Sequence, residues 1–118
     1  MTGKDILACD DRTYETVEIP EWNCALRVGT LSIRDRLQIE IAARPNSDSD
    51  SEAELQALIV GKSLYNGDGQ RVFADADIEE LANKSAVVLK RVVDVALRLN
   101  RMRAVDVETA QADFTAAR

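Results

Sequence analysis

The strongest constraint on the fold of this 118-residue chain is an apolar stripe in residues 81–102. Its members recur every three or four positions, the spacing that places side chains on one face of a helix. They are Leu81, Val88, Leu89, Val92, Val95, Ala96, Leu99 and Met102. Lysine, arginine and aspartate side chains fall between them. Such a face must be covered by other elements, so this segment is expected to organise the core.

A shorter helix is predicted just before this one. Its start is rich in carboxylates, at Asp75, Asp77, Glu79 and Glu80. Free backbone amides and the positive end of the helix dipole favour carboxylates at such a position. Residues 83–85 then interrupt the pattern, because Asn and Ser compete for backbone hydrogen bonds and favour caps. The sequence therefore predicts two helices that meet near Ser85.

An N-terminal β-hairpin is predicted from two segments rich in β-branched residues, 16–19 and 25–28. Residues 20–23 (Pro-Glu-Trp-Asn) join them, and Pro and Asn are turn formers. Asn23 is the residue best suited to a left-handed backbone position there. Because two strands alone are marginal in water, the hairpin is expected to pack on helices.

Two further helices are predicted in the middle of the chain. The first covers residues 33–43; Ser32 and Asp35 mark its start, and Ile33, Leu37 and Ile41 form its apolar stripe. The second covers residues 51–64, and Gly61 is a weak point near its end. Residues 46–50, which are polar and acidic, are expected to be a solvated linker.

These elements predict an α+β, mainly α-helical fold, in which a two-stranded hairpin is followed by about four helices. Residues 1–13 are expected to be a flexible N-terminus because they are polar and weakly patterned. Residues 14–102 are predicted to form a single hairpin-plus-helical domain. Residues 103–118 have no sustained stripe and are expected to be a tail that is disordered or is ordered only by a partner.

Composition excludes several classes of protein. The net charge of −6 argues against a nucleic-acid surface, which needs clustered Lys and Arg to contact phosphates. No apolar run approaches the roughly 18 residues needed to span a bilayer. Cys9 and Cys24 do not form a CxxC pair, so two free thiols in a reducing compartment are the simplest interpretation. The chain is expected to be soluble and cytosolic.

The residues for common catalytic chemistry are missing. The chain has no histidine, which removes the commonest general base and most transition-metal sites. The loop at residues 66–70 (Asn-Gly-Asp-Gly-Gln) resembles a calcium loop in composition, but neither register places glycine and ligands correctly. A hairpin-like Asp-Gly turn that returns Val72 and Phe73 onto the preceding helix is favoured. We predict no enzyme activity, no cofactor and no metal.

Trp22 has two interpretations that the sequence leaves open. A lone tryptophan at a hairpin turn either clamps the hairpin onto the helices or stays at the surface as a binding anchor.

Several short segments, in this order, resemble the tail assembly chaperones of long-tailed, siphophage-type bacteriophages. They are residues 17–22 (Val-Glu-Ile-Pro-Glu-Trp), 26–28 (Leu-Arg-Val), 31–36 (Leu-Ser-Ile-Arg-Asp-Arg), 68–73 (Asp-Gly-Gln-Arg-Val-Phe), 77–81 (Asp-Ile-Glu-Glu-Leu) and 84–85 (Lys-Ser). The Gly-Gln-x-Val-Phe turn that runs into an acidic helix carries most of the resemblance. Asn23 departs from the pattern, since such sequences tend to have glycine there.

The resemblance implies a function without catalysis. Members of this family bind the long, largely helical tape-measure protein, keep it soluble and help bring tail-tube subunits to it. By the same resemblance, the partners are the tape-measure protein and the major tail-tube protein, and copies of the chain can associate. The expected location is the bacterial host cytoplasm, with the protein absent from the mature virion.

Trp22, Tyr65 and Phe73 are the candidate partner-binding residues. The main alternative is a small structural tail or neck component that stays in the virion. An adaptor unrelated to phage and a small enzyme are more distant alternatives.

Overall fold

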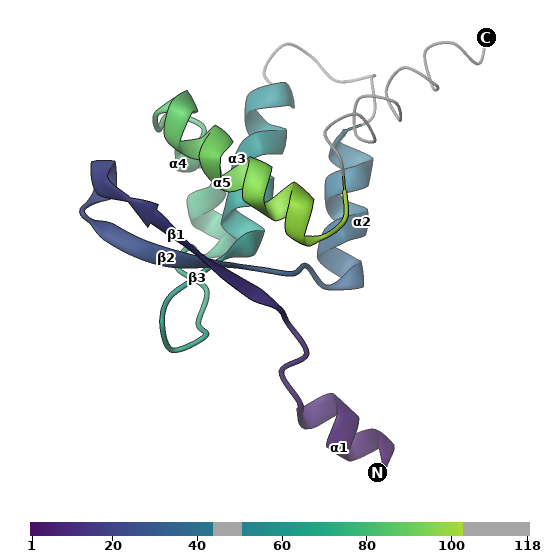
Figure 1. The fold of residues 1–118 in the computed structure, drawn as a ribbon. Coiled ribbons are helices and arrows are strands. Elements are labelled where there is room, and N and C mark those ends of the chain that lie inside the picture. Colours follow the sequence, from purple (N-terminus) through teal and green to yellow (C-terminus); the bar gives the residue numbers. More distant parts are fainter. Residues whose placement is uncertain (44–50, 103–118) are drawn as a thin grey trace, which may run out of the picture.

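A computed structural model describes residues 1–43 and 51–102 of the chain (Figure 1). The helices are α1 (Gly3–Ala8), α2 (Ile33–Ala42), α3 (Ser51–Ser63), α4 (Ile78–Leu81) and α5 (Ala86–Leu99). The strands are β1 (Tyr14–Ile19), β2 (Cys24–Gly29) and β3 (Leu64–Tyr65), and short 3-10 turns occupy Pro20–Trp22 and Asp75–Asp77. This confirms the predicted α+β, mainly helical class.

The sheet is antiparallel, with the strand order β1-β2-β3. The predicted hairpin is present, and Val17 is paired with Leu26 across it. Asn23 closes the turn with a left-handed backbone (φ 56°), as predicted. The third strand was not predicted. Leu64 was assigned to the end of the preceding helix, but it pairs with Val28 because the chain extends directly after Ser63.

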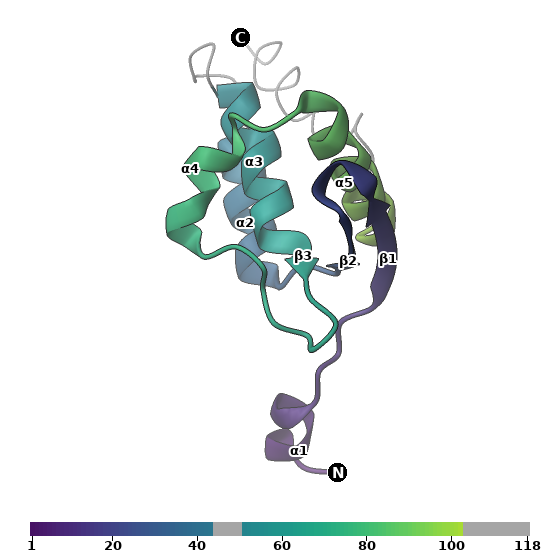
Figure 2. The same ribbon diagram turned by 90° about the vertical axis from the view of Figure 1, so that its left-hand side faces the viewer.

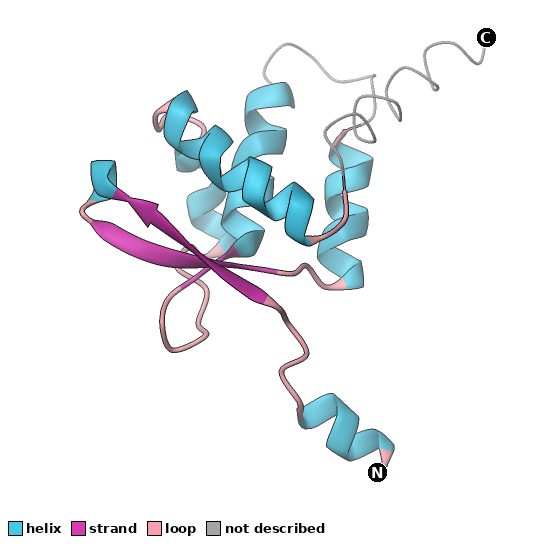
Figure 3. Cartoon of the chain, in the orientation of Figure 1, coloured by secondary structure: helices cyan, strands magenta, loops and turns pink. Residues whose placement is uncertain are grey.

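The helices α2 to α5 lie on one side of this sheet (Figure 3). α3 packs against α2, α4 and α5, and α5 also contacts β1 and β2. The fully buried side chains come from every one of these layers: Ile19, Val28, Ile39, Val60, Leu64, Leu81, Val88 and Val92. An aliphatic core, built from helices and a small sheet, is therefore what holds the domain together.

The predicted division into two helices near Ser85 is confirmed, since α4 ends at Leu81 and α5 begins at Ala86. The buried face of α5 is wider than predicted. Val95 and Leu99 are only half-buried, whereas Val93 and Leu97 are buried as well. The reason is that α5 is contacted by α3 on one side and by the hairpin on another, so more than one stripe is covered.

The stripe predicted for α2 is not the face that α2 turns to the core. Ile33, Leu37 and Ile41 are 80%, 52% and 57% exposed, respectively, whereas Ile39 is fully buried and Ala43 nearly so. Two residues correspond to a rotation of about 200° around a helix, so the Ile39 face lies opposite the Leu37 face. The expectation that this stripe is buried was therefore wrong.

The N-terminal residues contain a helix that was not predicted. α1 is capped by Thr2, whose hydroxyl accepts a hydrogen bond from the Asp5 amide, and it has no buried residue. It projects away from the rest of the chain (Figure 1). The flexibility of residues 1–13, and their separation from a domain at 14–102, stay predictions. The predicted linker at 46–50 and tail at 103–118 lie outside the described residues.

Candidate partner-binding surface

An exposed row of aliphatic side chains runs along α2. We call Ile33, Leu37 and Ile41 the α2 ridge. They recur every fourth residue, so they follow one side of the helix. Single exposed apolar residues are common on proteins, but three large ones in a row on one helix face make a candidate interaction surface.

The orientation of the ridge is fixed by contacts on the other side of α2. The Asp35 carboxylate lies 3.6 Å from the Lys62 ammonium of α3. Just before the helix, the Leu31 amide donates a hydrogen bond of 2.6 Å to the side-chain oxygen of Asn100, which follows α5. Together with the buried Ile39, these contacts hold the ridge away from the core.

A groove of about 550 Å³ adjoins the ridge, between α2, α3 and the segment that contains α4. α2, α3 and α4 lie beside one another in Figure 2. The groove is lined by apolar side chains from all three helices and from the residue after α4: Ile41, Ala42, Leu58, Ile78 and Ala82. Ile41 belongs to both the ridge and the groove, so the two form one continuous apolar surface.

Charges around the groove are predominantly negative. Lys62 is buried, and its ammonium lies 3.0 Å from the Asp75 carboxylate in addition to its contact with Asp35. Hydrogen bonds from Lys62 and Arg71 lower the pKa of Asp75, so this carboxylate stays ionised beside them. The positive charge of Lys62 is thus neutralised within the protein. Glu54 and Glu79 also line the groove, and they form no ion pair with the residues that the structure describes.

The three predicted binding residues do not form a single surface. Trp22 and Phe73 are half-buried at the margin of the core, where their rings meet edge to face with centroids 6.2 Å apart. Tyr65 is only 3% exposed, and its ring meets that of Tyr14 at 5.5 Å. Trp22 therefore packs at the margin of the core and keeps part of its surface exposed. A role for these residues in partner binding stays a prediction, and the burial of Tyr65 does not favour it.

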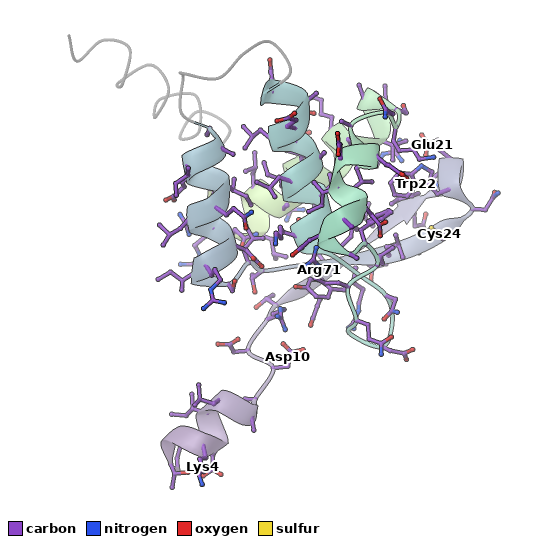
Figure 4. All side chains as sticks on the ribbon, turned by 180° about the vertical axis from the view of Figure 1, so that it is seen from behind. Lys4, Asp10, Glu21, Trp22, Cys24 and Arg71 are labelled. Atoms are coloured by element: carbon purple, nitrogen blue, oxygen red, sulfur yellow. The ribbon has the colours of Figure 1, made fainter. Side chains whose placement is uncertain are left out.

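The tip of the hairpin is fixed to α5 by a bidentate ion pair. The two guanidinium nitrogens of Arg91 lie 2.8 Å from the two carboxylate oxygens of Glu21, the neighbour of Trp22 (Figure 4). These hydrogen bonds lower the pKa of Glu21 to about 2. A second pair joins α5 to β1, with Arg98 Nη1 3.0 Å from Glu15 Oε1. Trp22 is therefore held in a defined position.

The loop at residues 66–70 forms the predicted hairpin-like turn. The Asn66 side-chain oxygen accepts hydrogen bonds from the amides of Asp68 and Gln70, and Gly69 has a positive φ of 80°. Arg71, labelled in Figure 4, then ties the loop to α3 by donating to the carbonyl oxygen of Gly61. The side-chain oxygen of Asn66 is thus used inside the turn.

Within residues 1–43 and 51–102, no group of three or more acidic or cysteine side chains is arranged to hold a metal ion. In the same residues, no helix is both long and apolar enough to cross a membrane. Cys9 and Cys24 are exposed free thiols.

The α2 ridge was missed as a binding surface because α2 carries two competing apolar faces. Ile33, Leu37 and Ile41 form the longer row and were assigned to the core by size and spacing. Ile39 and Ala43 form the shorter row that is buried. The apolar residues on both sides make the helix only weakly amphipathic, and this was the one signal that its buried side was undetermined.

Comparison with known proteins agrees with these observations. The family model described as phage tail assembly chaperone matches residues 5–113. The fold is similar to that of the bacteriophage HK97 tail assembly chaperone, with a TM-score of 0.66 and 19% sequence identity over 81% of this chain and 94% of that one. No match was found among curated protein sequences. Since the family model covers most of its length, the chain belongs to the phage tail assembly chaperone family.

Proposed function

We propose that this protein binds the tape-measure protein of its phage, keeps it soluble before the tail tube forms, and helps recruit tail-tube subunits. Membership of the family supports the chaperone role. The observation that carries the choice of surface is the α2 ridge, three large aliphatic side chains that the core does not use.

The ridge suits a helical client. An amphipathic helix presents apolar residues in rows spaced by three or four positions, and such rows pack against a row spaced by four on a second helix. Covering the client's apolar stripe removes it from water, and this stabilises the complex by about 25 cal/mol for each Å² of apolar surface buried. The net charge of −6 then helps to keep the complex dispersed.

The remaining partners follow from the same role. The rings of Trp22 and Phe73 form a second, partly exposed cluster, which could bind the tail-tube protein or another copy of the chain. A chaperone that acts before polymerisation works in the host cytoplasm and leaves before the virion is complete. The alternative is a small structural tail or neck component, which would be retained in purified particles.

Co-expression tests the proposal. The wild-type chain is produced together with the longest, most helical open reading frame encoded just downstream of it, and solubility and co-purification are measured. The proposal predicts that this partner is soluble only with the chaperone and elutes with it. If the two neither associate nor change each other's solubility, tape-measure binding is refuted. Detection of the chain in purified particles would favour the structural alternative.

A further inference from the structure

The groove beside α2 combines an apolar lining with an acidic edge. Its lining comes from α2, α3, the 3-10 turn at Asp75–Asp77 and α4, so the groove is formed by the fold and not by the surface of one helix. Its volume of about 550 Å³ lies within the range of sites that bury several side chains or a small ligand. Glu54 of α3 and Glu79 of α4 line it from two neighbouring helices.

We propose that this groove selects the client segment, by accepting aliphatic side chains from an amphipathic helix that carries Lys or Arg about one turn away. This inference rests on the proposed function and adds to it the chemical class of the segment that is bound. The ridge supplies unspecific apolar contact, whereas the groove with its acidic edge distinguishes one apolar helix from another.

The charge argument depends on which groups are already paired. Lys62 lies in the wall of the groove, but Asp35 and Asp75 neutralise it at 3.6 and 3.0 Å. Arg71 is likewise engaged, with Nη1 2.9 Å from Asp75. Glu54 and Glu79 are exposed and have no cationic partner among the described residues. A basic residue of the client completes these pairs, whereas an acidic residue is repelled.

A second copy of the chain is the competing occupant. α1 exposes Ile6 and Leu7 and carries Lys4, so it has the same apolar and basic character on a short helix. α1 contains only six residues, however, and provides one apolar turn. The apolar surface formed by the groove and the ridge together extends along α2, which a longer client helix covers better. Occupation by α1 is therefore an outcome that the test must separate.

Two synthetic peptides test the inference. Each has about 18 residues, enough for a helix that is stabilised when bound. Both carry the same leucine row with a period of four, and only the flanking charge differs, lysine in one and glutamate in the other. Fluorescence anisotropy with the full-length chain should show the lysine peptide binding about tenfold more tightly near 0.02 M salt, with the preference shrinking as salt screens the charges.

Charge reversal locates the preference. The variant Glu54→Lys/Glu79→Lys should invert it, so that the glutamate peptide binds more tightly. The control Asp11→Lys/Glu18→Lys changes the net charge by the same amount at exposed positions outside the groove, and it should keep the lysine preference. Equal binding of both peptides to the wild type, or inversion by the control as well, overturns the inference.

Two further measurements separate the remaining outcomes. If α1 of another copy fills the groove, Ile6→Ser/Leu7→Ser dissociates an oligomer in sedimentation velocity and peptides bind only to that variant, which overturns the inference. Co-expression with the tape-measure protein distinguishes the two proposals. Peptide discrimination without client solubility refutes the proposed function alone, and client solubility without discrimination refutes this inference alone.

Discussion

Two isoleucines two residues apart on α2 provide a direct test of its orientation. Ile39 is fully buried and Ile41 is 57% exposed. Both lie inside the same helix, so replacement of either by alanine changes the local helix propensity in the same favourable direction, by a few tenths of a kcal/mol. Any difference between the two variants therefore reports burial.

The expected magnitudes are well separated. Ile39→Ala removes three buried carbons, worth about 0.8 kcal/mol each in transfer, and leaves a cavity in addition. The expected loss in the free energy of unfolding is about 2.5–4 kcal/mol. For Ile41→Ala, a change within about 0.5 kcal/mol is expected, since the side chain is mostly in water.

Urea denaturation followed by circular dichroism measures both values. The urea midpoint should fall strongly for Ile39→Ala and stay near the wild-type value for Ile41→Ala. In both variants the slope of the free energy of unfolding against urea concentration should be unchanged. If Ile41→Ala is as destabilising as Ile39→Ala, or if the order is reversed, α2 turns its other face to the core. The α2 ridge would then not exist as a binding surface.

Three further predictions test other parts of the fold. A Cβ at Gly61 would lie 2.5 Å from Cγ1 of Ile78, so Gly61→Ala should lower the free energy of unfolding by about 1–3 kcal/mol despite better helix propensity, and the added change Ile78→Ala should relieve part of this loss in the same urea assay. The pKa of Glu21 falls from 4.5 to about 2 through its hydrogen bonds with Arg91. The Glu21–Arg91 pair therefore stabilises the fold above about pH 4.5, and this stabilisation is lost as the pH falls toward 2. Glu21→Gln should accordingly lower Tm at pH 7 and leave Tm near pH 2 unchanged. Equal lowering of Tm at both pH values would contradict this. Because the backbone of Asn23 is left-handed, Asn23→Val should lower the free energy of unfolding by about 1–2 kcal/mol, whereas Asn23→Gly should leave it almost unchanged. Equal losses in urea denaturation would contradict the turn geometry.

Local chemistry explains which parts of the fold could be predicted from the sequence. The turn depends on Asn23, which tolerates a left-handed backbone, and the break near Ser85 falls in residues 83–85, where Asn and Ser disfavour a continuous helix; both were found where predicted. The strand Leu64–Tyr65 was missed because two residues carry no periodicity. Its formation depends on the edge of β2, which lies far away in the sequence.

The orientation of α2 could not be predicted for a similar reason. Spacing alone favours the row with Leu37, which contains three large residues. The competing row with Ile39 is buried on the side where Asp35 meets Lys62 of α3, and Asn100 holds Leu31 just before the helix. These are long-range contacts that no local pattern encodes.

The candidate site was predicted only at the level of the family. The short segments that resemble tail assembly chaperones identified the class, and the family model confirms it. The aromatic residues were chosen because aromatic side chains are common anchors at interfaces. In the structure, Tyr65 is used inside the sheet, whereas the aliphatic ridge of α2 provides the larger exposed surface.

The affinity of Leu37→Ser for the tape-measure protein measures whether the α2 ridge binds this client. The matched control is Val87→Ser, since Val87 is a 68% exposed aliphatic residue on α5. Both variants should unfold at the wild-type urea midpoint. If the ridge binds the client, Leu37→Ser should bind it about tenfold more weakly, equivalent to about 1.4 kcal/mol, and Val87→Ser should bind it like the wild type. Equal binding by the two variants would rule out a role of the α2 ridge in holding the client.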